Sequence, residues 1–389
     1  MFILALAYLA FASIALPPSM LGVVWPSMRL SFGQPLSAAG LVPPVGVVAG
    51  LISTSLAPYI VRRIGVGRLL AIGTFLSAAA LGVSAASATM WQFLGSVALL
   101  GLAAGAVDAT LNAFAARRFG PRRINMLHAS FGLGAAASPL IVTAVIVSGL
   151  SWRWSYVIVM GLQFAVAITF AVTWRRWEAP VNGPVATSER TVGVWGTDSV
   201  LGMVMVAVQN GIESAVAIWA FTFLTGLGVS TAVAGGLASG YWLTLVVGRV
   251  ALGSLAERIG AWKVMALAAG LLLVAAVLVN VEMPIPAMAA VLLFGLAAAP
   301  MYPLLVLTTA ERTSPDVADR VIGFQAAASS IGSAITPGLI GLAIGYELRA
   351  FGWSLAALCV VAAVLLLLIH HRVRTAPTRT AFRAPAQPV

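Results

Sequence analysis

Residues 99–114 read LLGLAAGAVDATLNAF, an apolar run that carries a single carboxylate, Asp108, near its middle. A second run at 204–221, VMVAVQNGIESAVAIWAF, carries Glu213 in the same way. The chain has 11 acidic residues, and the others lie between such runs or at their ends. A carboxylate in a bilayer interior is costly and persists mainly where it faces a cavity and has a function. These stretches therefore predict a polytopic membrane transporter in which Asp108 is the first candidate for the working acid.

The composition indicates that lipid is the solvent of most of the chain. Hydrophobic residues make up 61% and charged residues 8%, with a mean hydropathy of +1.02, whereas soluble domains contain about 25% charged residues. A helix of about 20 apolar residues spans a bilayer. Twelve such runs occur, with approximate cores at 4–27, 38–60, 68–88, 92–115, 127–148, 155–174, 199–223, 232–253, 263–281, 287–309, 322–344 and 351–369. We therefore expect an all-α membrane protein with twelve transmembrane helices.

The positions of the basic residues predict the orientation. With the N-terminus inside, nineteen of the 22 Lys and Arg residues fall on one side of the membrane, and only Arg29, Arg153 and Arg349 fall on the other. This positive-inside pattern predicts that both termini are cytoplasmic, in a cell membrane of the bacterial inner-membrane type. The net charge of +11 is thereby explained by topology, and we expect no nucleic-acid partner. The single Cys359 provides no disulfide framework.

Internal repeats divide the chain into two halves. APYIVRRIGVGR (57–68) and GSLAERIGAWK (253–263) each place a glycine after Arg-Ile, and these glycines, Gly65 and Gly260, are 195 residues apart. GLAAGAVD (101–108) and GLAAAPMY (295–302) are 194 apart, and ASPLI and TPGLI follow in the same order. Duplicated six-helix halves enclose a midplane cavity and rock about it, the arrangement of alternating access. The predicted parts are an N-terminal bundle (1–174), a cytoplasmic linker (175–198), a C-terminal bundle (199–371) and a disordered basic cytoplasmic tail (372–389).

The loop GSLAERIGAWK (253–263) resembles the Gly-x-Leu-Ala-Asp-Arg-x-Gly signature of the major facilitator superfamily, with Glu257 in place of the Asp. The first-half copy of the signature is degenerate. In that superfamily the loop is a cytoplasmic latch that does not bind substrate. The resemblance implies this role for Gly253, Glu257, Arg258 and Gly260. Glu257 is also a candidate to pair with Arg249 across the end of the eighth span, and loop charges that only obey the topology are the alternative.

A narrower resemblance covers most of the chain. The patterns G-x-x-D-A-x-x-N-A-F in the fourth span, R-I-N-M-L-H-A-S-F-G-L-G-A in the fifth and N-G-I-E-S in the seventh are similar to the fucose permease branch of sugar–proton symporters. The resemblance matches Asp108 to that branch's carboxylate in the fourth span, with Asn112 one turn later. The fucose permease also has an acid in the first span, where this chain has Gly22. Either coupling uses Asp108 alone, or the substrate differs from fucose.

Two residues are candidates for proton coupling. Asp108 shares one helix face with Gly101, Gly105 and Asn112, and the small glycines allow a neighbouring helix to approach. The polar pair would then point into the cavity, where Asp108 would load a proton on one side and release it on the other. The alternative is a neutral Asp108 bonded to Asn112 as helix glue. His128 is the only histidine well inside a span, and it serves either a proton relay or packing.

Substrate contacts are predicted mainly in the seventh span. Gln209, Asn210 and Glu213 lie within about one turn, and amides with a carboxylate supply the several donors and acceptors that a sugar needs. Glu213 instead pairs with a backbone group or binds a cation in the alternative interpretation. Weaker members of the set, for which packing is the alternative, are Trp219, Trp242, Tyr302 and Gln325.

No nucleotide-binding or hydrolase motif occurs, so we expect a transporter and no enzyme, without cofactor or metal site. The leading hypothesis is proton-coupled symport of a monosaccharide or similar small polar solute by a monomer in the bilayer. Sodium coupling remains open. A proton-coupled antiporter exporting drugs or metabolites is the alternative, because Gly134-x-x-x-Ser138-Pro139 is part of an antiporter pattern. A membrane-embedded sensor or scaffold is a third class.

Overall fold

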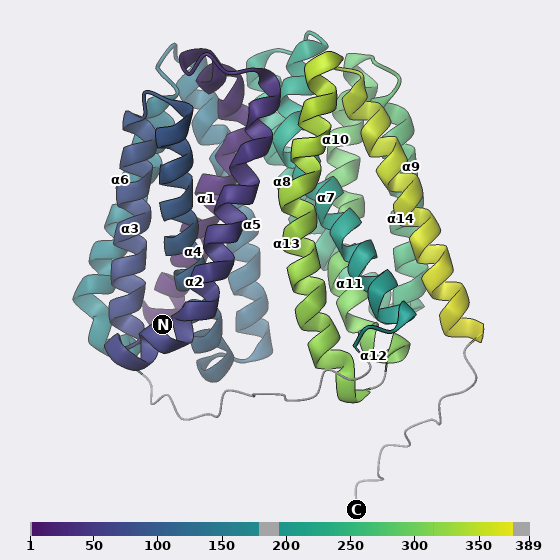
Figure 1. Cartoon of the computed structure of the whole chain (residues 1–389), viewed down its shortest axis with the longest axis horizontal. Helices are drawn as coiled ribbons and strands as arrows, with labels where there is room; N and C mark the ends of the chain where they lie inside the picture. Colours follow the sequence, from purple (N-terminus) through teal and green to yellow (C-terminus); the bar gives the residue numbers. More distant parts are fainter. Residues whose placement is uncertain (1, 179–193, 314, 376–389) are drawn as a thin grey trace, which may run out of the picture.

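The computed structural model describes residues 2–178, 194–313 and 315–375, and these residues are almost entirely helical. Figure 1 shows two groups of helices side by side, α1–α6 from the N-terminal half and α7–α14 from the C-terminal half. Twelve candidate membrane spans lie within the described residues. The prediction of an all-α protein with twelve spanning helices is confirmed.

The first group contains α1 (Phe2–Ser31), η1 (Leu36–Leu41), α2 (Val42–Ile64), α3 (Val66–Ala86), α4 (Met90–Arg118), α5 (Pro121–Val147), α6 (Arg153–Thr173) and η2 (Trp174–Trp177). The second contains α7 (Thr197–Gly226), α8 (Thr231–Ile259), α9 (Ala261–Val279), α10 (Pro284–Ala298), α11 (Met301–Leu307), α12 (Thr309–Arg312), α13 (Pro315–Tyr346) and α14 (Ala350–Thr375). The start of α1 and the end of α14 lie at the same end of the molecule (Figure 1). We call this the arginine-rich end, because the basic clusters at 62–68, 117–123 and 372–374 lie there.

The tenth predicted span differs from a single helix. The predicted core 287–309 is divided into α10, α11 and α12. Pro300 lies between α10 and α11, and Pro303 lies in the first turn of α11; each lacks the N–H that would continue the helical hydrogen-bond ladder. The interruption leaves backbone carbonyls at this depth available to side chains of other helices.

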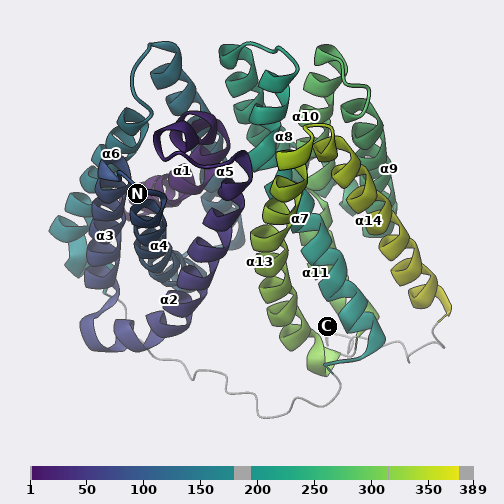
Figure 2. The ribbon, with the colours of Figure 1, turned by 45° about the horizontal axis from the view of Figure 1, so that its top comes forward.

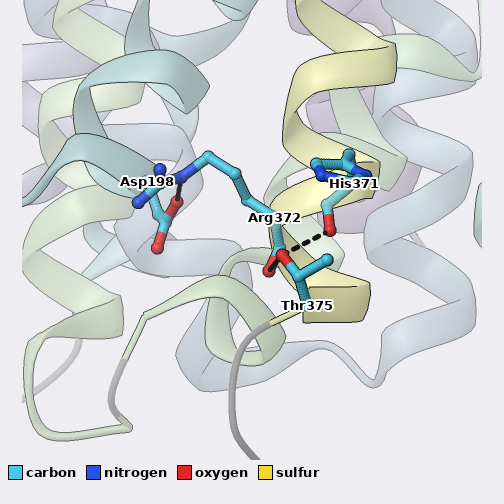
Figure 3. Close-up of polar contacts among 4 residues, drawn as sticks. All are labelled: Asp198, His371, Arg372 and Thr375. Atoms are coloured by element: carbon cyan, nitrogen blue, oxygen red, sulfur yellow. Dashed lines mark hydrogen bonds and ion pairs between the residues drawn. The ribbon is translucent and has the colours of Figure 1, made fainter.

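The predicted tail begins too early. α14 continues to Thr375, so Arg372 and Arg374 are helical. Arg372 Nε donates to Asp198 Oδ1 in the first turn of α7 at 2.6 Å (Figure 3), and this ion pair joins the end of α14 to the start of the C-terminal half. Residues 175–177 of the predicted linker belong to η2 (Trp174–Trp177), and α7 begins at Thr197 within it. Residues 179–193 of the linker and 376–389 of the tail lie outside the described residues.

The two halves meet backbone to backbone at the end opposite the arginine-rich end, which we call the closed end. A Cβ built on Gly22 of α1 lies 2.4 Å from Ala217 O of α7, and one on Gly40 of η1 lies 2.4 Å from the Cα of Gly338 in α13. Figure 2 shows α5 and α8 facing each other between the groups. There, Ser239 Oγ of α8 donates to Ala136 O of α5 at 2.6 Å. Glycine and serine at these positions let the halves pack without large side chains between them.

The repeat seen in the sequence has a structural counterpart at the arginine-rich end. Gly65 ends α2 with a φ of 85°, and Gly260 ends α8 with a φ of 94°. Side chains with a Cβ rarely adopt such positive φ values, so glycine is required at both turns. The two matching Arg-Ile-Gly segments therefore make the same turn, one between α2 and α3 and the other between α8 and α9.

Candidate functional site

Asp108 lies on the face of α4 that packs against α2. The glycines one and two turns before it allow this contact, since a Cβ on Gly105 lies 2.5 Å from Gly50 O and one on Gly101 lies 2.5 Å from Gly46 O. Thr54 of α2 donates to Gly105 O at 3.2 Å. The predicted role of the glycines in close helix approach is thus seen in the structure.

The bond between Asn112 and Asp108 involves the main chain. Asn112 Nδ2 donates to the backbone oxygen of Asp108 at 3.0 Å, and both residues are partly buried. The same amide also lies close enough to act on the Asp108 carboxylate. Asn112 therefore holds the local backbone and is a polar neighbour of the carboxyl group, and the helix-glue alternative stays open.

Glu213 is partly buried in α7, beside an anchored stretch of backbone. The hydroxyl of Tyr241 in α8 donates to the main-chain oxygen of Glu213 at 2.9 Å. The neighbouring Ser214 donates to Ser333 O of α13 at 2.7 Å. These bonds hold the α7 backbone on both sides while leaving the Glu213 carboxylate itself without a hydrogen bond to any described residue.

The two amides of the predicted set are arranged differently. Gln209 is fully buried, and its Nε2 donates at 3.3 Å to Ala298 O, at the end of α10 where the helix is interrupted. Gln209 Oε1 is buried and has no hydrogen-bond partner among the described atoms. Asn210 is partly buried, and its Nδ2 donates back to Val206 O at 3.2 Å. Gln209 thus connects α7 to the break in α10 and keeps one unused acceptor.

Arg249 does not form the ion pair with Glu257 that was one of its two predicted roles. It lies eight residues before Glu257 on the same helix, α8, about 12 Å along the axis, and no ion pair joins the two within the described residues. Arg249 lies instead near Glu213 of α7 and His128 of α5. An Arg well inside the apolar run YWLTLVVGRVALG is the sequence signal that could have identified it as a member of the site.

His128 lies on α5 in the N-terminal half. The side chain is exposed, and its ring meets that of Phe11 edge-on with centroids 5.7 Å apart. One turn further along α5, a Cβ on Gly132 lies 2.2 Å from Val246 of α8. His128 and Arg249 therefore border the same contact between the halves, from opposite sides.

Two residues predicted to contact substrate serve helix packing in this conformation. Trp219 is fully buried, its Nε1 donates to Pro337 O of α13 at 2.8 Å, and its ring lies against Gly341. Gln325 is also fully buried, with Oε1 3.1 Å from the hydroxyl of Thr309. Tyr302 and Trp242 remain partly buried, and Trp242 packs edge-on against Tyr241.

The sequence analysis did not single out Arg312, which organises the surroundings of Gln325. Arg312 is 3% exposed and donates to the main-chain oxygens of Leu305 and Thr308 and to Thr309 Oγ1. Burial lowers the pKa of its guanidinium to about 10, although the negative charges of Asp198 and Glu311 act in the opposite direction and raise it. A Cβ on Gly202 of α7 would meet this guanidinium. The cluster joins α12, α13 and α7 near the arginine-rich end.

The predicted latch loop is anchored within its own half. Trp262, two residues after Gly260, donates through Nε1 to Glu311 Oε2 of α12 at 3.1 Å, and its ring lies 5.0 Å from that of His370 in α14. Glu257 and Arg258 are exposed, and Gly253 has open space around its Cα. The loop therefore connects α8 and α9 to α12 and α14.

The antiporter pattern in α5 contributes to contacts with α1. A Cβ on Gly134 lies 2.0 Å from Ala12 O, and Ser138 Oγ donates to Leu16 O at 2.6 Å. Both residues are buried. The pattern is thereby accounted for by helix packing.

Comparison with known proteins places this architecture in a family. The sequence profile described as Major Facilitator Superfamily matches residues 2–281 and 200–388. The crystal structure of the nucleoside transporter NupG superposes with a TM-score of 0.75 at 14% identity, covering 97% of this chain and 100% of that one. The crystal structure of a D-xylose-proton symporter gives a TM-score of 0.73 at 17% identity, covering 94% of this chain and 96% of that one. A mutant of the peptide transporter POT gives 0.74 at 14% identity, covering 95% and 94%. No curated protein sequence matches the chain.

Proposed function

The chain belongs to the Major Facilitator Superfamily and is a multi-pass membrane transporter rather than an enzyme, and we propose that it is a proton-coupled symporter. The proposed substrate is a monosaccharide or a similar small polar solute, carried by alternating access of the two halves. The proposed resemblance to the fucose permease branch stays a prediction. So do a monomeric state and an orientation with both termini cytoplasmic, which the charge asymmetry supports.

The observation that carries the proposal is the state of the Asp108 carboxyl group. It lies deep in a span and is partly buried, with Asn112 as a polar neighbour and no ion pair to a described residue. A carboxylate at this depth is costly when ionised. A carboxyl group that no cation holds in the ionised form can take up a proton and release it, as the proposal requires.

The substrate side of the proposal rests on α7 and α8. Glu213, which is partly buried, supplies acceptors, and the partly buried Asn210 supplies an amide within one turn of it. Trp242 offers a partly buried aromatic ring of the kind that packs on the apolar face of a pyranose. The similarity in fold to the D-xylose-proton symporter agrees with a sugar, whereas the nucleoside transporter shows that the same fold accepts other polar solutes.

The substrate should first be found by thermal stabilisation. The purified protein is screened with monosaccharides, nucleosides and hydrophobic cations, because a ligand that binds only the folded state raises the melting temperature. Stabilisation by sugars supports the proposal. Stabilisation by hydrophobic cations alone supports the antiporter and overturns the sugar assignment.

Coupling is then tested by uptake into proteoliposomes. With an inward proton gradient, the wild-type protein is expected to accumulate the stabilising sugar, and Asp108→Asn to lose accumulation while keeping substrate exchange at equilibrium. Asp319→Asn, which removes an exposed carboxylate near the start of α13, is the matched control and should accumulate as wild type. Full accumulation by Asp108→Asn would refute the role of Asp108. Accumulation driven by a sodium gradient alone would replace the proton by sodium.

A further inference from the structure

A shallow apolar groove runs along the outer face of the N-terminal half, between α3 and α6. Its volume is about 330 Å³, and all its lining residues are apolar: Ala71, Ile72, Phe75, Leu76, Phe164, Ala167, Ile168 and Ala171. The rings of Phe75 and Phe164 lie 5.9 Å apart at one end of the groove. Ile72, Phe75 and Ile168 are each about half exposed. In a membrane this groove opens to lipid.

A cationic cluster lies one helical turn beyond the other end of the groove. The Arg68 guanidinium lies over the Trp174 ring, 4.3 Å from its centroid, and that of Arg175 lies 5.3 Å from the same centroid. Both arginines are exposed, and neither takes part in an ion pair with a described residue. The carboxylate of Glu178 is nearby, with Oε1 3.7 Å from a Cβ built on Gly65. The cluster keeps a net positive charge after that carboxylate is counted.

We propose that the groove and the cluster together bind one anionic phospholipid. One acyl chain lies in the groove, and the phosphate lies against Arg68 and Arg175. The helix α6 rises about 15 Å between Phe164 and Trp174, which suits the upper part of an acyl chain below its headgroup. Trp174 occupies the level of the membrane interface, where tryptophan is favoured.

Charge and shape together select this occupant. Arginine binds phosphate oxygens through two parallel N–H groups, and stacking on Trp174 holds both guanidinium groups at one place. A zwitterionic lipid such as phosphatidylcholine also carries a phosphate, but its choline cation would lie beside the two arginines and oppose binding. A second copy of the chain would have to present an acid to them.

Native mass spectrometry of the full chain in detergent tests the headgroup contact. Dioleoylphosphatidylglycerol and dioleoylphosphatidylcholine have the same acyl chains and differ in headgroup charge. We expect one phosphatidylglycerol per protein to be retained preferentially. In Arg68→Gln/Arg175→Gln the preference should fall by about fivefold for each arginine. The control Arg62→Gln/Arg63→Gln removes the same charge from the exposed end of α2 and should keep the preference.

A second pair of variants tests the groove. Ala171→Trp places a large ring among the lining residues of the groove and should lower retention of both lipids. Val172→Trp is the control, because Val172 is the next residue, does not line the groove and is 78% exposed; it should not lower retention. The proposal is overturned if the control charge variant loses as much preference as the arginine pair. It is also overturned if Ala171→Trp retains phosphatidylglycerol as wild type, since binding would then be a general attraction of charges.

Discussion

Adding one methyl group at Gly22 should shift the protein away from the conformation described here. A Cβ at this position lies 2.4 Å from Ala217 O and 2.9 Å from Ile218 O of α7. Ordinary contacts of a Cβ begin at 3.4 Å, so α1 and α7 must separate by about 1 Å at this point. The opposing atoms belong to the backbone and cannot rotate away.

The size of the effect follows from overpacking. Extra carbon atoms in a well-packed contact cost about 1–3 kcal/mol. Only conformations in which α1 packs on α7 at the closed end bear this cost, and the proposed alternating access separates the two halves there. The ratio of closed to open molecules at this end should therefore fall by about 5- to 150-fold in Gly22→Ala.

Spin labels at the ends of α1 and α13 can measure the shift. Leu30 and Tyr346 are exposed at the closed end, one in each half, and Cys359, the one cysteine, is buried and can be replaced by Ala. Electron–electron resonance distances between labels at Leu30→Cys and Tyr346→Cys should gain a longer component in Gly22→Ala.

The matched control is Gly236→Ala. Gly236 lies on α8 near the same end, and a Cβ there has no heavy atom within 4 Å. The distribution of distances between the two labels in Gly236→Ala should equal that in the labelled protein without this substitution. The reasoning is refuted if Gly22→Ala leaves the distribution unchanged, or if Gly236→Ala lengthens it to the same extent.

Three further substitutions test individual contacts, each by thermal unfolding of the purified protein. Gly260→Ala forces a Cβ into a φ of 94° and should destabilise the protein by about 1 kcal/mol. The control Gly253→Ala lies inside α8 with open space around it and should stabilise the protein slightly. Equal effects of the two variants would contradict the requirement for glycine at the turn after α8. Arg312→Lys keeps the charge but loses the guanidinium's hydrogen bonds to backbone carbonyls, at an expected cost of about 2 kcal/mol, and an unchanged melting temperature would show that the cluster is not needed. Trp219→Phe removes the buried hydrogen bond to Pro337 O and should lower the free energy of unfolding by about 1 kcal/mol without changing sugar affinity. A loss of affinity at unchanged stability would indicate that Trp219 contacts the substrate after all.

The sequence predicted the number and order of the spanning helices because lipid imposes a simple rule. Every backbone group in the bilayer must be bonded, so each long apolar run becomes a helix. The residues at which the helices end were harder to predict. Arg372 lies beyond the apolar run, yet it is helical and pairs with Asp198, which is far away in the sequence.

Site residues were harder to predict for a related reason. The polarity of a side chain can be read from the sequence, but its neighbours depend on how helices pack. Trp219 is covered because glycine at 341 admits its ring, and Gln325 because Arg312 and Thr309 lie beside it. Arg249 was assigned through its distance along the chain to Glu257, although a straight helix keeps those two apart. Asp108 and Glu213 were found because a carboxylate is unusual at their depth.

The two deep carboxylates have different surroundings, and this difference suggests different tasks. Arg249 lies near Glu213, whereas within the described residues no basic side chain comparably adjoins Asp108. A nearby cation favours the ionised form of a carboxyl group and burial opposes it, so Glu213 can balance Arg249 when it is ionised and can accept hydrogen bonds from a substrate. Asp108 has no such partner and can become neutral without leaving a cation unpaired. Because the carboxylates lie in different halves, proton binding and substrate binding need no shared atom. They can be linked through the packing between α5 and α8, where His128 and Arg249 face each other across the boundary of the halves.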